Sequence, residues 1–233
     1  MMSEAAMTTI DRPLGLGEVL AETVELYGRR IWALVGTGAV LAASIVAASV
    51  VPIGIDLVLV ALGLVGCYAA AARIAAGDSF AEAWSQVIVR LPVLLVLGLV
   101  VAIPLALALA DIILILLVVA WIAFAGFSVP VAMLEREERG TWYGEIGHAL
   151  FRAMTLARAE YLHALGVAAV LAIVWLLLGR VLGAALVGFA ENGGFVAFLI
   201  VQALLGPFFF LGLSVLYFEQ TARALSSPRE QRT

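Results

Sequence analysis

The sequence lacks residues on which several common classes of protein depend. It has no lysine, so all 13 of its basic residues are arginine, and the formal net charge of its 233 residues is −4. A nucleic-acid partner therefore has no basic surface to bind. The single cysteine, Cys67, excludes an intramolecular disulfide, and its place in an apolar run is typical of a small buried side chain.

Catalytic motifs are missing as well. The sequence contains no G-x-S-x-G, no Walker loop and no H-E-x-x-H. Its two histidines, His148 and His163, are 15 residues apart without a nearby cysteine, which does not fit the ligand spacing of a metal site. We therefore expect a protein that is not an enzyme and holds no metal and no cofactor.

Charge itself is scarce, because only 13% of the residues are charged and 64% are hydrophobic. A soluble domain carries about a quarter charged residues, so the composition predicts an all-α integral membrane protein. The first 30 residues contain five acidic residues and no apolar run, which argues against a cleaved signal peptide. We expect the first membrane span to target the chain.

Apolar segments long enough to cross a hydrocarbon core of about 30 Å occur six times. We expect them at 31–51, at 57–72, twice within 91–133 with a turn at Ala110 and Asp111, at 161–179 and at 195–218. The segment 181–190 is too short to cross alone, so it either extends the fifth span or re-enters the membrane. The predicted membrane domain covers 14–223, with cytoplasmic tails at 1–13 and 224–233. The middle parts of the spans hold polar or amphipathic residues but no acid, base or histidine; these residues are Ser44, Ser49, Tyr68, Trp121 and Gln202.

Three segments that precede spans have the spacing of amphipathic helices. The first covers 14–30. The second begins with Ser79-Phe80-Ala81-Glu82, which has the S-x-x-E form of a capping box. The third begins near Thr141 and lies in the stretch 135–163, which combines the densest run of charge with a helical apolar stripe. We expect each helix to lie at a membrane surface.

The three amphipathic segments also predict an internal repeat. Glu18, Glu82 and Glu145 stand near their starts, 64 and 63 residues apart, and arginines stand near their ends. We infer three repeats, over about 14–76, 77–139 and 140–223. Each repeat is an amphipathic surface helix followed by a two-span hairpin, which gives six transmembrane helices in total.

The arginines orient this arrangement. Twelve of the 13 fall on one side of the six spans, and Arg180 alone falls on the other. By the positive-inside rule, the side with twelve arginines is cytoplasmic. We therefore expect a multi-pass protein of a bacterial cytoplasmic membrane with both termini in the cytoplasm.

One candidate contact site is a group of arginines on the amphipathic helices, namely Arg30, Arg90, Arg152 and Arg158. In this position they suit anionic lipid headgroups or a cytoplasmic partner. The alternative is that they only anchor the helices at the interface and set the topology.

A second candidate is an extracytoplasmic polar cluster of Asp56, Asp111, Arg180 and Glu191. Charges near lipid often mark a transport pathway. The alternative is structural: the two aspartates cap helices and close a turn, while Arg180 snorkels to the headgroups or pairs with Glu191.

Two stretches resemble a known family. They are R-P-L-G-L-G-E-V-L at 12–20 and V-L-Y-F-E-Q-T-A-R at 215–223. With the layout between them, they resemble the membrane domain of bacterial glycerophosphoryl diester phosphodiesterases and its stand-alone six-span relatives. Glu219 and Thr221 replace the aspartate and the first arginine usual in the closing motif. In that family the chemistry belongs to a separate soluble domain, so the resemblance implies a membrane module and no catalytic residue.

Two functions fit these observations. The first is a non-catalytic polytopic membrane protein that interacts with membrane lipids or is a scaffold for a cytoplasmic or membrane protein partner. The alternative is a small-solute transporter or channel that uses the extracytoplasmic polar cluster. A water-filled path to the middle of the bilayer would favour transport, whereas a packed bundle with a lipid-filled side groove would favour the first function.

Overall fold

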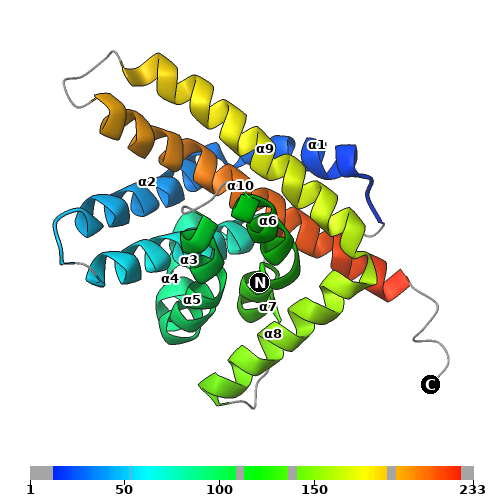
Figure 1. The fold of residues 1–233 in the computed structure, drawn as a ribbon. Coiled ribbons are helices and arrows are strands. Elements are labelled where there is room, and N and C mark those ends of the chain that lie inside the picture. The colour runs from blue at the N-terminus through cyan, green and yellow to red at the C-terminus, as the bar shows by residue number, and fades with distance from the viewer. Residues whose placement is uncertain (1–12, 53, 109–112, 136–140, 188–192, 227–233) are drawn as a thin grey trace.

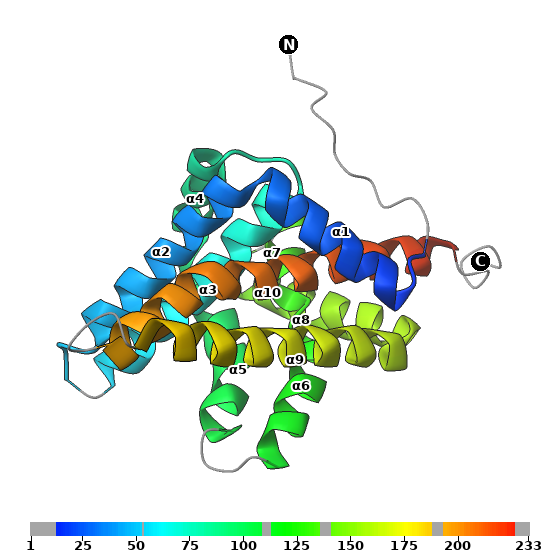
Figure 2. The same ribbon diagram turned by 90° about the horizontal axis from the view of Figure 1, so that it is seen from above.

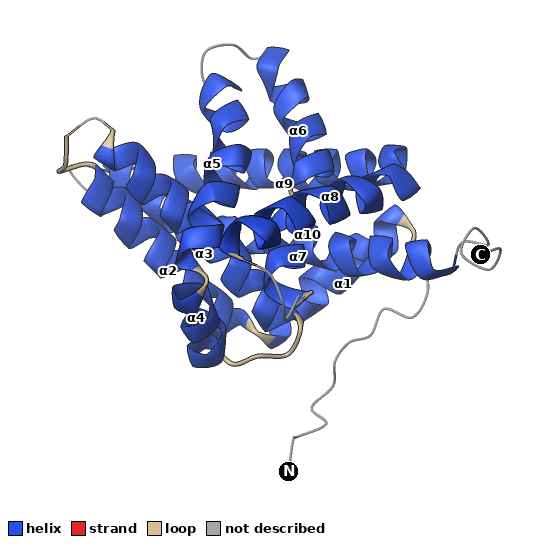
Figure 3. Ribbon diagram, turned by 90° about the horizontal axis from the view of Figure 1, so that it is seen from below, coloured by secondary structure: helices blue, strands red, loops and turns tan. Residues whose placement is uncertain are grey.

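The computed structural model describes residues 13–52, 54–108, 113–135, 141–187 and 193–226, and for 102–108 and 113–116 only the backbone. Within these ranges the chain forms ten helices and no strand (Figure 3). The helices are α1 Leu16–Arg29, α2 Ile31–Ala48, α3 Ile55–Ala75, α4 Phe80–Val89, α5 Leu91–Ala108, α6 Ile113–Ala125, α7 Ser128–Leu134, α8 Trp142–Ala159, α9 Tyr161–Leu186 and α10 Gly193–Ser226. The prediction of an all-helical protein is confirmed.

The three predicted amphipathic segments form helices α1, α4 and α8. The capping box before α4 forms as predicted, since the Glu82 carboxylate accepts bonds from the hydroxyl and the backbone N–H of Ser79, at 2.7 and 2.9 Å. The hydroxyl bond and then the backbone bond lower the pKa of Glu82, because both favour its charged form. One residue separates each amphipathic helix from the long apolar helix that follows it, namely Arg30, Arg90 or Glu160.

Five segments of the described chain are long and apolar enough to cross a membrane, and a sixth results if the bent pair α4 and α5 is one span. The five are Ile31–Ala48, Ile55–Ala75, Leu117–Leu134, Tyr161–Leu186 and Gly193–Leu225. Helix α9 continues to Leu186, so the start of the segment 181–190 extends the fifth span. These lengths and compositions are those of a multi-pass membrane protein.

The fourth predicted span is present as Leu117–Leu134, but its helix is interrupted between α6 and α7. At the break, the Gly126 N–H donates to the Ile122 carbonyl at 2.8 Å, and a Cβ on Gly126 would lie only 2.3 Å from that oxygen. Only glycine fits this tight turn. Helix α7 then begins at Ser128.

The long helices form hairpins that do not all run the same way. The tips of α2–α3 and α9–α10 lie at the same end of the molecule (Figure 1), and α10 packs along α2, α3 and α9. Hairpin α5–α6 points away from the direction of the other two (Figures 2 and 3), and α5 turns by 87° from α4. An amphipathic helix followed by two long helices occurs three times, but α7 has no counterpart, so the three-fold repeat stays a prediction.

Helix α10 is held against its neighbours where Pro207 interrupts its hydrogen bonds. Proline has no N–H, so the Ala203 carbonyl loses its helical donor. A Cβ on Gly38 of α2 would lie 1.9 Å from this carbonyl oxygen, so glycine is what allows the two backbones to approach. One residue further on, the Leu204 carbonyl accepts a 2.7 Å bond from the Tyr27 hydroxyl of α1. The hydrogen bond from Tyr27 thereby ties the amphipathic helix α1 to α10 close to Pro207.

Candidate functional site

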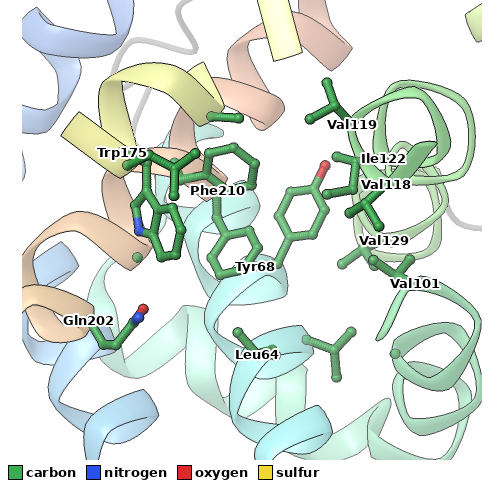
Figure 4. A pocket seen from close by; sticks show the side chains of 16 residues that line it. Leu64, Tyr68, Val101, Val118, Val119, Ile122, Val129, Trp175, Gln202 and Phe210 are labelled. Atoms are coloured by element: carbon green, nitrogen blue, oxygen red, sulfur yellow. The ribbon is translucent and has the colours of Figure 1, made fainter. Parts of the chain in front are cut away.

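A cavity of about 290 Å³ lies in the middle of the described bundle, between α3, α5, α6, α7, α9 and α10 (Figure 4). Its walls are mainly aliphatic and aromatic side chains, with Tyr68 and Gln202 as the hydrogen-bonding exceptions beside the indole of Trp175. Ligand pockets usually measure about 300 to 1,000 Å³. The cavity is therefore of a size for one chain or one ring system of a lipid, and too small for a whole phospholipid.

One wall of the cavity is aromatic. Tyr68 of α3 stacks on Phe210 of α10, with ring centroids 5.1 Å apart and planes 18° apart. Trp175 of α9 lies 6.4 Å from Phe209, and Phe209 lies 5.6 Å from Phe210. Three helices thus contribute one continuous set of rings. Aliphatic side chains of α5, α6 and α7 face this set across the space (Figure 4).

Tyr68 places a polar atom in this apolar space. Its side chain is only 2% exposed, and its hydroxyl has no hydrogen-bond partner among the described residues. The hydroxyl points toward α6, beside Val119 and Ile122 (Figure 4). A buried hydroxyl without a partner destabilises a protein by about 1 to 3 kcal/mol. This atom therefore has an unmet hydrogen bond among the described residues.

A groove of about 250 Å³ between α9 and α10 continues the cavity, since Trp175, Leu176 and Gln202 line both spaces. Small residues open the groove, namely Gly179, Gly183, Gly194 and Ala197. The exposed Arg180 also lies along it. The two spaces form one path from the middle of the bundle to the end of the α9–α10 hairpin.

The predicted extracytoplasmic cluster is described only in part. Asp111 and Glu191 lie outside the described residues. Asp56 is a cap, because its carboxylate accepts two backbone N–H groups at the start of α3, both at 2.7 Å. Arg180 lines the groove. The grouping of these four residues into one site stays a prediction.

Charged side chains gather at the end of α7. Arg73 of α3 donates to the Met133 carbonyl at 3.5 Å, and Arg90 donates to the Ala132 carbonyl. The last carbonyls of a helix lack helical partners and carry partial negative charge, so cations stabilise them. Both arginines therefore hold α7, the helix whose Val129 lines the cavity.

Glu135 follows α7 and joins it to two further helices. Its carboxylate accepts bonds from Arg152 of α8 at 3.1 Å and from the Tyr217 hydroxyl of α10 at 2.9 Å. His148 lies 4.0 Å from the same carboxylate. We call the side chains around the end of α7 the polar layer: Arg73, Arg90, Glu135, His148, Arg152 and Tyr217. The polar layer fixes α3, α4, α7, α8 and α10 to one another.

A buried ion pair lies further along α10. The Glu219 side chain is fully buried, and it accepts bonds from Arg223 at 2.6 Å and from Gln220 at 3.0 Å. Arg223 also donates to Glu160 and, at 3.0 Å, to the Leu14 carbonyl. The two stretches that carry the family resemblance, 12–20 and 215–223, are therefore in direct contact.

The arginines predicted to bind headgroups are used in different ways. Arg90 and Arg152 belong to the polar layer and bond within the chain. Arg30 is half-buried at the end of α1, and Arg158 is exposed near the end of α8. Contact with anionic lipid by these residues stays a prediction, and the structure suits Arg30 and Arg158 to it better than the other two.

The histidines do not assemble a metal site in the described part of the chain, where no group of three His, Cys, Asp or Glu side chains has a suitable arrangement. His148 lies beside Glu135, and His163 lies 3.7 Å from Glu219. Each histidine therefore faces one carboxylate of a different polar group.

Comparison of this chain with protein-family models, with curated proteins and with solved structures finds no match. The resemblance to the membrane domain of glycerophosphoryl diester phosphodiesterases therefore remains a prediction from two short motifs. The cavity and its groove are therefore the features of the molecule that indicate a function.

Sequence reasoning did not find the cavity. Tyr68 and Gln202 stand out in the sequence only as polar residues within predicted spans. A polar residue at such a depth is the signal that marks a site in a membrane protein, but the sequence does not show that α3 and α10 turn these side chains toward one space. Trp121 carries the same signal and has a structural role, since its indole donates to the Val100 carbonyl of α5 at 3.1 Å.

Proposed function

We propose that this protein is a non-catalytic polytopic membrane protein that binds part of a lipid in the central cavity, with the rest of the lipid in the groove between α9 and α10. The observation that supports this function is an apolar cavity within the long helices that continues into a groove along two of them. Hydrocarbon in the cavity would make dispersion contacts with its aliphatic and aromatic walls.

The chemistry of the walls favours a lipid over a small polar solute. A polar group that leaves water for an apolar space loses about 2 to 7 kcal/mol unless it finds a hydrogen bond there. The lining of the cavity offers such bonds at Tyr68, Trp175 and Gln202, and its other side chains are apolar. A solute with several polar groups would find too few partners along this path.

A pair of variants on α9 tests lipid binding. Ala172 lines the cavity, whereas its neighbour Ile173 is 54% exposed on the outer face of the same helix. Ala172→Phe should fill the cavity and reduce the lipid retained after purification, counted by native mass spectrometry, while Ile173→Phe should retain it. Val119→Phe, which fills the cavity from α6, is a second variant should the first fail to fold. Equal lipid counts for parent and both cavity variants would contradict the proposal.

We also propose the membrane setting: a bacterial cytoplasmic membrane, six spans in three repeats, and both termini in the cytoplasm. Twelve arginines on one side of that arrangement support it. Reporter fusions test it at six places: Asp56, Asp111 and Asn192 should lie outside, and Gly77, Gly140 and the C-terminus inside. A cytoplasmic signal at Asn192 would rule out the six-span arrangement.

A further inference from the structure

The depth of Tyr68 restricts what can bind beside it. Tyr68 stacks on Phe210 of α10. Along α10, Phe210 is nine residues from Val201, which lies in the groove beside Gly179, and seven residues from Tyr217, which belongs to the polar layer. At 1.5 Å per residue these separations are about 14 Å and about 10 Å. In a hydrocarbon core about 30 Å thick, the Tyr68 hydroxyl then lies well inside. The oxygens of a phospholipid stay at the membrane surface and its tails carry none, so an ordinary acyl chain does not give this hydroxyl an acceptor.

The aromatic wall indicates the shape of the group that binds. Rings attract one another in offset or edge-to-face arrangements at centroid separations of about 4.5 to 7 Å, because their faces are electron-rich and their edges electron-poor. Tyr68, Phe209, Phe210 and Trp175 already use this spacing among themselves. A planar, electron-poor ring could stack on these aromatic side chains in the same way, whereas a flexible hydrocarbon chain would gain nothing from their orientation.

We propose that the cavity takes the ring of a lipid-soluble carbonyl compound of the quinone class. This inference rests on the proposed lipid-binding function and narrows the ligand. The Tyr68 hydroxyl donates to a ring carbonyl oxygen, which satisfies the one cavity-lining hydroxyl that has no partner among the described residues. The apolar tail of the ligand passes Gln202, where the cavity meets the groove, and lies between α9 and α10.

Two probes with the same ring size and tail test the carbonyl requirement. Decyl-1,4-benzoquinone carries the acceptor oxygens, and decylbenzene lacks them. Binding to the purified full chain is measured by titration in detergent, with each probe expressed as a mole fraction of the detergent. We expect the parent to bind the quinone about tenfold more tightly than the hydrocarbon, the effect of one buried hydrogen bond.

Tyr68→Phe removes the hydroxyl and keeps the ring. This variant should bind the quinone about tenfold more weakly than the parent and bind decylbenzene equally well. Tyr143→Phe is the matched control, because Tyr143 is 64% exposed on α8 and does not line the cavity; it should bind both probes as the parent does. Val119→Phe fills the space beside the hydroxyl and should weaken binding of both probes.

The outcomes separate this inference from the proposed function. Equal affinity of the parent for both probes would overturn the quinone assignment and leave apolar binding in the cavity standing. A preference for the quinone that persists in Tyr68→Phe would also overturn it, because the carbonyl would then be recognised elsewhere. Failure of both probes to bind the parent would overturn both proposals.

Discussion

The buried pair of Glu219 and Arg223 allows a quantitative test of how the two ends of the membrane domain are held together. Arg223→Met keeps a long side chain but leaves the fully buried Glu219 carboxylate without its guanidinium. Removing one partner of a buried pair typically costs about 3 to 5 kcal/mol. The Arg223 side chain is 23% exposed, so we expect the free energy of unfolding to fall by about 3 kcal/mol.

The double variant separates the ion pair from the other bonds of Arg223. Replacing both residues by methionine removes the uncompensated charge as well as the pair, and such replacements are often neutral or stabilising. The bonds from Arg223 to Glu160 and to the Leu14 carbonyl are lost too, at about 1 kcal/mol for a typical net hydrogen bond. We therefore expect the double variant to be more stable than Arg223→Met, with a coupling free energy of about 2 kcal/mol or more.

Reversible unfolding in mixed detergent micelles, followed by helical circular dichroism, measures these values. Arg29→Met is the matched control, because the Arg29 side chain is half-exposed and lies 3.4 and 3.8 Å from Glu22 and Glu25. Exposed pairs contribute about 0 to 1 kcal/mol. Equal losses of stability in Arg223→Met and Arg29→Met would refute a buried ion pair. A double variant whose loss of stability equals the sum of the losses in its two single variants would refute it as well.

Four further substitutions test local features by the same unfolding assay. Ser79→Ala should cost about 1 kcal/mol, because it removes the N-cap of α4. Since the pKa of Glu82 is lowered from its ordinary 4.5, the stability that Glu82 contributes is present above pH 4.5 and disappears as the pH falls through the lowered pKa, so Glu82→Gln and the parent should converge in acid. Trp121→Phe should cost about 1 kcal/mol, the hydrogen bond from α6 to α5. Gly126→Ala should lower the free energy of unfolding by about 1 to 3 kcal/mol, because the added Cβ would clash with the Ile122 carbonyl. Unchanged stability in any of these variants would contradict the cause given for it.

The features that sequence reasoning predicted correctly are those encoded by near neighbours. Ser79 and Glu82 are three residues apart, so a capping box can be recognised from the sequence. Thr141 is the residue before the first turn of α8, as its residue type predicts, but its side chain makes no capping bond. The amphipathic spacing of α1, α4 and α8 is equally local. Long apolar runs likewise predict long helices, because any backbone group in lipid must be bonded within its own helix.

The features that escaped prediction depend on contacts between distant residues. Nothing near Arg90 or Arg152 in the sequence shows that both reach the end of α7, 42 residues from Arg90 and 17 residues from Arg152. In the sequence, Gly126 does not differ from the other glycines of the apolar runs. Only the structure shows that a Cβ at this position would clash with the Ile122 carbonyl. The cavity is the hardest feature to predict, because its lining comes from six helices whose positions relative to one another the sequence does not show.

The polar layer bears on the choice between a binding protein and a channel. None of its side chains lines the cavity within the described chain, and α7 separates the two, with Val129 in the cavity wall and Glu135 bonded to Tyr217 beyond it. Helix α10 runs from the cavity to the polar layer, because Phe210 in the cavity wall and Tyr217 in the polar layer are seven residues apart and so lie on the same face of the helix. A molecule that enters along α9 and α10 therefore meets a hydrogen-bonded layer where the cavity approaches α7. Under the proposed function, a lipid enters from the membrane and leaves the same way, whereas conduction of a solute past α7 would require the bonds around Glu135 to break.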